Sequence, residues 1–237
     1  MKLSIIVPVF NEESTIDELL DRVMAVNLGS IEKEVIISND GSSDGTSRAI
    51  ERSRWAHDPQ VKALHSPINL GKGAAVRLGM HHASGDIMLI QDADLELDPR
   101  EYGRLLAPIL AGETDVVYGS RFLDASRDIS RRTRWANRAL TLLTNVLFGS
   151  RLTDMETAYK VIRRSALANI RLRCVGFDFE PEVTARLLLA GQKIVEVPVG
   201  YQPRRIEEGK KIGVRDGFDA VYALLKCRLE GRPRAPR

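Results

Sequence analysis

Short apolar segments alternate with amphipathic segments of about a dozen residues along the first half of this chain, and this alternation constrains the fold more than any other feature. The apolar runs are short and rich in β-branched residues, which is typical of buried strands. They cover residues 3–10, 35–38, 61–64 and 86–91. The segments between them carry apolar residues at helical spacing, as from Ile16 to Met24. This order indicates βαβ units and predicts the α/β class, with a mainly parallel central sheet flanked by helices.

The second half of the chain is less regular but has the same kinds of element. Residues 115–120 and 193–199 read as strands, and residues 135–148, 179–190 and 218–229 read as helices. The sequence contains no internal repeat and no low-complexity linker. We therefore expect one domain over residues 1–230, followed by a basic tail at 231–237.

Composition excludes several classes of protein. Hydrophobic residues make up 43% of the 237 residues, which is enough for a packed core. No apolar run reaches the length of a membrane span, and Cys174 and Cys227 do not form a C-x-x-C pair. We expect a cytoplasmic protein with reduced thiols, either soluble or peripheral on the inner face of the cytoplasmic membrane.

Charge is distributed unevenly along the chain. From Gly200 onward ten basic residues face five acidic ones, while the whole chain has a net charge of +3. The basic segment from Arg204 to Lys211 is suited to phosphates or anionic lipid, although a basic end can also serve solubility alone. Aromatic residues are only 5% of the chain and no nucleic-acid-binding motif is present, so we expect no nucleic-acid partner.

Two carboxylates follow the strand at 86–91. Asp92 and Asp94 are two residues apart at the predicted strand end, with Glu96 two residues further on. Carboxylates so spaced can reach one hard divalent cation, such as Mg²⁺ or Mn²⁺, and that cation would neutralise a diphosphate leaving group. The alternative is that these acids only cap the helix expected near Pro99.

Two further turns follow strands. The turn Asn39–Gly45 contains Asp40, which can accept hydrogen bonds from a base or a ribose, and Asp44. The segment Asn69–Ala75 opens a helix with two glycines around Lys72, a setting that favours an anionic group. For both turns the alternative is a structural role alone: simple capping in the first and a tight turn in the second.

An arginine-rich connection follows the strand at 115–120. Six arginines lie between residues 121 and 138, at positions 121, 127, 131, 132, 134 and 138. Arginine binds phosphate with two-pronged geometry, and a phosphate monoester is already ionised at pH 7, so it needs no base to act as a nucleophile. The alternatives are a solvated basic loop and, for the helix at 135–148, contact with lipid, with the core or with another subunit.

Taken together, these segments resemble glycosyltransferase family 2, within the GT-A (Rossmann-like) fold. The resemblance runs from residue 3 to about residue 228. Within the family, the chain is most similar to the branch of dolichol-phosphate mannose synthases and polyprenyl-phosphate glycosyltransferases. The resemblance to the family lies in segments 6–12, 39–45, 69–73 and 91–96. The resemblance to the branch lies in 119–121, 153–154, 157–160 and 205–211. Lys210 stands where that family usually has a serine.

The resemblance implies a role for each matching residue. Catalytic roles fall on Asp92, Asp94, Arg121 and Asp154, with Asp154 near the rim of the active site. Metal binding falls on Asp92, Asp94 and Glu96. Donor binding falls on Pro8, Phe10, Glu12, Asp40, Asp44, Lys72 and Asp92. Binding of an acceptor phosphate falls on Arg121, Arg131, Arg132, Arg134, Arg205 and Lys211.

The activity implied is inverting, metal-dependent transfer of a hexose from GDP-mannose or a UDP-sugar to a polyprenyl or dolichyl phosphate at a membrane surface. A membrane protein or a second copy of the chain is an expected partner. One alternative is a transferase that extends a glycan, with Glu96 or Asp154 as the base that a hydroxyl acceptor requires. Another is a catalytically silent nucleotide-sugar binder or membrane adaptor.

Overall fold

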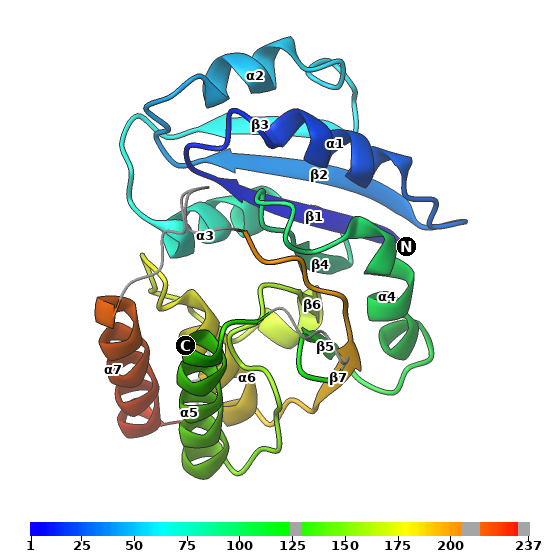
Figure 1. Ribbon diagram of the computed structural model, residues 1–237. Coiled ribbons are helices and arrows are strands. Elements are labelled where there is room, and N and C mark those ends of the chain that lie inside the picture. The colour runs from blue at the N-terminus through cyan, green and yellow to red at the C-terminus, as the bar shows by residue number, and fades with distance from the viewer. Residues whose placement is uncertain (124–128, 205–213, 232–237) are drawn as a thin grey trace.

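The computed structural model describes residues 1–123, 129–204 and 214–231, and its centre is one seven-stranded sheet with the order β3-β2-β1-β4-β6-β5-β7 (Figure 1). The strands are β1 (Lys2–Val9), β2 (Glu32–Asn39), β3 (Val61–His65), β4 (Ile87–Ile90), β5 (Val116–Ser120), β6 (Lys160–Arg163) and β7 (Ile194–Pro198). The helices are α1 (Ile16–Ala25), α2 (Thr46–Arg52), α3 (Lys72–His82), α4 (Tyr102–Leu110), α5 (Arg131–Phe148), α6 (Phe179–Leu189) and α7 (Val214–Glu230). Short 3₁₀ helices cover Pro99–Glu101 and Arg164–Leu167.

The sheet is mainly parallel, as the sequence predicts. Strand β1 pairs in parallel with β2 and β4, β2 with β3, and β5 with β7. Strand β6 runs antiparallel to its neighbours β4 and β5. The carboxyl ends of β1, β2, β4 and β5 therefore lie at the same edge of the sheet, where α/β proteins place their ligand sites.

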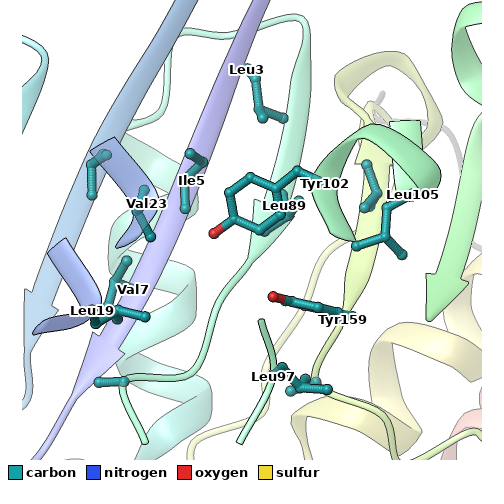
Figure 2. Packing of buried hydrophobic residues seen from close by; sticks show 14 of the residues in the cluster. Leu3, Ile5, Val7, Leu19, Val23, Leu89, Leu97, Tyr102, Leu105 and Tyr159 are labelled. Atoms are coloured by element: carbon teal, nitrogen blue, oxygen red, sulfur yellow. The ribbon is translucent and has the colours of Figure 1, made fainter. Parts of the chain in front are cut away.

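Helices cover both faces of the sheet. Side chains of β1 alternate between the two faces: Leu3, Ile5 and Val7 pack with α1 and α4, and Ile6 packs with α3 and α6. Figure 2 shows the first of these clusters, in which Tyr102 and Tyr159 lie among aliphatic side chains. Both tyrosines donate a hydrogen bond of 2.8 Å to Oε1 of the fully buried Gln91, so β4 is fixed just before the two aspartates.

Helices α5 and α7 lie side by side next to α6 (Figure 1), around a smaller cluster that includes Met155, Leu224 and Cys227. Both cysteines are buried and free, and burial raises the pKa of each thiol above its usual range. The described part of the chain holds no helix with both the length and the apolar character that crossing a bilayer requires.

All six strands that the sequence indicates are present, and the structure adds one. Strand β6 has only two apolar residues, Val161 and Ile162, between Lys160 and Arg163, so it gives no apolar run. Helix α5 begins at Arg131, four residues before the predicted start, because the Ser130 hydroxyl caps it by accepting a hydrogen bond from the Thr133 amide. Helix α7 also begins four residues before the predicted start, at Val214.

Candidate active site

The polar segments that follow β1, β2, β4 and β5 meet at one edge of the sheet. Asn11 has a positive φ of 53°, and its side-chain oxygen accepts a hydrogen bond of 2.8 Å from the Ser43 amide. In return, the Asn11 amide donates to the Ser42 hydroxyl. These bonds join the ends of β1 and β2 into one rim.

Asp40 is almost fully buried at the end of β2 and braces the next turn. Its two carboxylate oxygens accept hydrogen bonds of 2.9 and 2.7 Å from the amides of Leu70 and Gly71. Gly41 packs directly on this turn: its φ is +65°, and a Cβ atom there would lie 2.4 Å from the Ile68 carbonyl carbon. Asp44 accepts hydrogen bonds from Thr46 and from the Glu13 amide, so it joins the start of α2 to the turn after β1, and its donor-binding role stays a prediction.

The amides of the Asn69–Ala75 turn are used within the protein itself. Those of Leu70 and Gly71 bind Asp40, and those of Gly73 and Ala74 donate to the carbonyls of Gly176 and Val175. These bonds hold the turn in place, and the anion-binding role of Lys72 stays a prediction. The side chain of Lys72 points toward the segment Asp92–Glu96 after β4, which we call the acidic loop.

Lys72 lies between two carboxylates. Its ammonium is 2.8 Å from Asp92 Oδ2 and 2.8 Å from Glu180 Oε1, and both Lys72 and Glu180 are largely buried. Burial alone would lower the pKa of Lys72, but the two carboxylates outweigh it and raise the pKa above its usual range. Glu180 is the second residue of α6; sequence reasoning missed it because it is distant in the chain from both partners.

Asp94 lies in a concentration of negative charge. Burial, together with the charges of Asp92 and Glu96, raises the pKa of Asp94 to about 7. Among the described residues, its carboxylate accepts one hydrogen bond, of 3.1 Å from the Glu96 amide. The intervening residue, Leu95, has a positive φ of 62°, a conformation that is uncommon for a leucine and that often occurs at functional sites.

The described segment 201–204 crosses the acidic loop. Glu96 accepts hydrogen bonds from the Tyr201 hydroxyl and the Arg204 amide, each 2.8 Å long. The guanidinium group of Arg204 donates to the Asp94 carbonyl and forms an ion pair with Glu12. Arg204 was grouped with basic residues suited to phosphate, and the structure gives it these internal partners.

Arg121 and Asp154 form a buried ion pair at the end of β5. The guanidinium group donates two hydrogen bonds to Asp154, of 2.7 and 2.8 Å, and lies 5.3 Å from the centre of the Tyr201 ring. Asp154 also accepts hydrogen bonds from the Arg121 amide and from Asn137 in α5. Burial would raise the pKa of Asp154, but the Arg121 charge and these hydrogen bonds hold it below its usual range.

A second titratable cluster lies beside this pair, and sequence reasoning missed it. Burial and the Glu180 charge raise the pKa of Glu156 to about 7, and its Oε1 atom is buried without a hydrogen-bond partner. Burial lowers the pKa of Lys160, whose ammonium donates to the carbonyls of Met155 and Thr157. The one available signal was that Glu156 lies two residues after Asp154.

The acidic loop fits a divalent ion that takes part of its coordination from a substrate. Within residues 1–123, 129–204 and 214–231, no three His, Cys, Asp or Glu side chains are grouped so as to hold a metal ion. Asp92 and Asp94 nevertheless offer hard oxygen ligands, and the charges of Asp92 and Glu96 add to burial in raising the pKa of Asp94. Mg²⁺ is commonly held by one or two carboxylates together with substrate phosphates. Glu96 is occupied by Tyr201 and Arg204, so its role as a ligand stays a prediction.

The remaining predicted residues are distributed as follows. Pro8 lies in β1 and Phe10 follows it, and both are half-buried. Arg131 and Arg132 are exposed in the first turn of α5, where Arg134 is half-buried. Arg205, Lys210 and Lys211 lie outside the described residues, as does most of the tail 231–237. The binding roles given to all these side chains stay predictions.

Solved structures with a similar fold show the structural class of the protein. The fold is similar to crystal structures of glucosyl-3-phosphoglycerate synthase from Mycobacterium tuberculosis. The match to its complex with Mn²⁺, UDP and phosphoglyceric acid has a TM-score of 0.72 and 22% identity over 98% of this chain and 80% of that chain. The match to its complex with Mg²⁺ and UDP has a TM-score of 0.70. The architecture is the GT-A fold of glycosyltransferases.

The family follows from the sequence. The model for "Glycosyl transferase family 2" matches residues 4–171. The chain is 30% identical to undecaprenyl-phosphate mannosyltransferase of Micrococcus luteus, over 98% of this chain and 96% of that protein. It is 29% identical to glycosyltransferase AglD of Haloferax volcanii, over the whole chain but only 39% of that protein. It is 28% identical to undecaprenyl-phosphate 4-deoxy-4-formamido-L-arabinose transferase of Salmonella paratyphi A, over 95% of this chain and 67% of that protein. The chain belongs to glycosyl transferase family 2, and its enzyme class is that of a glycosyltransferase.

Proposed function

We propose that this chain transfers a hexose from a nucleotide-diphosphate sugar, GDP-mannose or a UDP-sugar, to a polyprenyl phosphate, with inversion at the anomeric carbon. The observation that carries the proposal is the Arg121–Asp154 pair, which lies beside the acidic loop and is joined to it through Tyr201. One side of this site is suited to a metal-bound diphosphate and the other to an anionic acceptor.

On the donor side, Asp92 and Asp94 would hold Mg²⁺ or Mn²⁺, which neutralises the charge of the departing diphosphate. Lys72 holds Asp92 in place and adds a fixed positive charge at the carboxyl end of β4. The Asp40-braced turn fixes the start of α3, from which Lys72 projects. These side chains therefore hold their orientation before a donor arrives, which reduces the cost of ordering them on binding.

On the acceptor side, Arg121 remains charged, since the carboxylate of Asp154 raises the pKa of its guanidinium group despite burial. A phosphate acceptor is ionised at neutral pH, so its oxygen can attack the anomeric carbon, opposite the diphosphate, without losing a proton. Asp154 is unsuited to be a general base, because its pKa is lowered and both its oxygens already accept hydrogen bonds. The site thus favours an acceptor that needs no base.

The names of the relatives support a polyprenyl phosphate as the acceptor. Two of them are named as transferases acting on undecaprenyl phosphate. One of these two matches this chain over 96% of its own length. The GT-A structures with Mn²⁺ or Mg²⁺ and UDP support a divalent ion beside a nucleotide diphosphate.

The test is transfer of label into lipid. Purified protein is incubated with Mn²⁺, a short polyprenyl phosphate and one radiolabelled nucleotide sugar at a time, and the products are extracted into butanol. We expect label in the organic phase with one donor and none when the unphosphorylated polyprenol replaces the acceptor. Asp94→Ala should abolish transfer in a folded protein, while Asp115→Ala, an aspartate paired with Arg163 away from the site, should retain it. Turnover by Asp94→Ala would refute the metal role.

Glu156 favours a second candidate, a family 2 transferase with a hydroxyl acceptor. Its raised pKa, near 7, and its unpartnered buried oxygen are properties of a general base. In that case Glu156→Gln would lower kcat and remove an ionisation near pH 7 from the pH–rate profile, with free sugars accepted in place of the lipid phosphate. With a phosphate acceptor, the same variant should keep the shape of the profile.

A further inference from the structure

Helix α7 carries large apolar side chains on the side that faces away from the protein. Its buried side is made by Ala220, Leu224 and Cys227. The opposite side holds four residues at helical spacing whose exposures range from 44% to 88%: Phe218, Tyr222, Leu225 and Leu229. An ordinary surface helix has polar residues on that side.

Helix α5 has apolar residues on both sides, since leucines on its inner side pack against the cluster that includes Met155, Leu224 and Cys227. Its fully buried residues are polar: Asn137, Thr141 and Thr144. Asn137 and Thr141 are used in hydrogen bonds to Asp154 and from the Met155 amide. Three large apolar residues on the outer side are 63% to 74% exposed: Trp135, Leu142 and Val146. Packing against the described residues does not explain why these three are apolar.

The two helices are neighbours (Figure 1), and their outer residues together form what we call the docking face: Trp135, Leu142, Val146, Phe218, Tyr222, Leu225 and Leu229. More than half of the exposed large apolar side chains of the described chain are on these two helices. Large apolar side chains exposed together on neighbouring helices are typical of a site of interaction with a protein or a membrane.

The charge of α5 distinguishes between those two occupants, since α7 has three acidic and three basic residues and no net charge. Helix α5 contains four arginines and no acidic residue, and Arg131, Arg132 and Arg138 are exposed. In a symmetric pair of copies, each face meets itself, so these arginines would be brought toward one another. An anionic bilayer would instead attract them, while tryptophan, tyrosine and phenylalanine side chains are well suited to the boundary between headgroups and acyl chains.

We propose that the docking face of α5 and α7 binds the surface of an anionic lipid bilayer, with the apolar side chains inserted and the arginines of α5 at the headgroups. Asn137 of α5 is bonded to Asp154, which holds Arg121. For the acceptor proposed above, which resides in a bilayer, this link would keep Arg121 close to the lipid surface. Bilayer binding does not require that reaction, so the two can fail independently.

The experiment is flotation with two kinds of vesicle, pure phosphatidylcholine and phosphatidylcholine mixed with phosphatidylglycerol. We expect the protein to float with the anionic vesicles and to be released by high salt. The double variant Leu142→Gln and Leu229→Gln should bind at least about tenfold more weakly, since each removes an inserted aliphatic side chain. The matched control is Leu110→Gln, at the end of α4, which replaces an equally apolar side chain that is 48% exposed outside the face.

Fluorescence gives an independent reading of the same contact. The chain has two tryptophans, so Trp55→Phe leaves Trp135 as the only one. Its emission should shift to the blue when anionic vesicles are added.

Failure to float, or equal binding by the double variant and the Leu110→Gln control, would overturn the proposal. Concentration-dependent dimers in light scattering that the double variant abolishes would assign the face to a second copy instead. Activity on a short, water-soluble acceptor should be the same in the double variant, which separates docking from catalysis.

Discussion

The guanidinium group of Arg121 donates two hydrogen bonds, of 2.7 and 2.8 Å, to the carboxylate of Asp154, whose side chain is fully buried. This pair connects the end of β5 to the loop before β6, and Asn137 extends the connection to α5. Its position makes it both a structural element and the centre of the proposed acceptor site. These two roles predict different outcomes for different substitutions.

Asp154→Asn should be strongly destabilising. It leaves the charge of Arg121 largely buried without its partner, and such a change costs about 3–5 kcal/mol. Because the pKa of Asp154 is lower in the folded protein than in the unfolded chain, its stabilising effect is complete above its ordinary pKa. That effect is lost as the pH falls through the lower, folded-state value. Urea unfolding at pH 7 and at successively lower pH values measures both effects.

The double variant Arg121→Met and Asp154→Leu is the control for this prediction. Replacing both charged groups by apolar side chains removes the uncompensated charge, so much of the stability should return. Sugar transfer should be absent in this variant, because the guanidinium group that would bind the acceptor phosphate is gone. If the double variant regained transfer as well as stability, Arg121 would have no role at the acceptor.

Glu180→Gln should weaken metal binding although Glu180 lies outside the acidic loop. At present the ammonium of Lys72 is shared between Asp92 and Glu180, at 2.8 Å from each. Without the Glu180 charge, Lys72 would neutralise Asp92 alone and compete more strongly with a cation for its oxygens. Calorimetric titration with Mn²⁺ in the presence of a nucleoside diphosphate should show affinity lower by about tenfold, the lower end of what other positioning residues around metals contribute.

Glu101→Gln is the matched control for Glu180, since it removes a carboxylate that pairs with the exposed Arg104 at α4. Its metal affinity should equal that of the wild type. Lys72→Met makes the opposite test: freeing Asp92 should strengthen Mn²⁺ binding while weakening binding of the nucleotide diphosphate. Equal Mn²⁺ affinity in all three variants would exclude Asp92 as a ligand.

The sheet was largely predictable because its strands are short apolar runs that end in polar turns. The runs at 3–10 and 86–91 correspond to β1 and β4. Strand β6 could not be predicted in this way. Its two ends are Lys160 and Arg163, and Lys160 is fully buried because its ammonium finds carbonyl partners and lies 4.3 Å from the centre of the Tyr118 ring. A buried lysine satisfied by tertiary contacts has no signature in hydrophobic periodicity.

The grouping of the candidate site residues was predictable where they follow strands, and less so where distant segments supply partners; their roles stay predictions. Asp92 and Asp94 were selected for their spacing after an apolar run, and Arg121 for the resemblance and for the arginine-rich connection that follows a strand. Glu180 and Tyr201 come from elements far along the chain, and only the assembled sheet brings them to Lys72 and Glu96. The partners Glu12 and Arg204 are a similar case, since each was assigned to a different ligand and the structure pairs them with each other.

Metal binding should depend on pH near neutrality. Burial and the charges of Asp92 and Glu96 raise the pKa of Asp94 to about 7 from an ordinary value of 3.8. A proton therefore competes with the cation, and Mn²⁺ affinity should rise between pH 6 and about pH 8. In metal-free protein the sign is opposite: this carboxylate lowers stability as the pH rises from about 4 to about 7, because the folded state holds the proton more tightly. Asp94→Asn should flatten both curves in calorimetry and thermal unfolding, and unchanged curves would contradict the raised pKa.

Gly41 should tolerate no side chain, because a side chain there would be strained by the positive φ and would also clash with a neighbour. Gly29 allows the cost of the backbone conformation to be measured without the clash. Gly29 and Gly41 have nearly equal φ values, +62° and +65°, but a Cβ atom at Gly29 would meet nothing within 4 Å. Gly29→Ala therefore measures the backbone cost alone, roughly 1–2 kcal/mol. Gly41→Ala adds a clash with the Ile68 carbonyl carbon at 2.4 Å, which must push the turn away from Asp40 and so displace the start of α3 and Lys72. We expect a larger loss of unfolding free energy in urea for Gly41→Ala, together with weaker binding of a nucleoside diphosphate, which Gly29→Ala should leave unchanged. If the two variants lost equal stability and Gly41→Ala bound the nucleotide normally, the Asp40-braced turn would not control the position of Lys72.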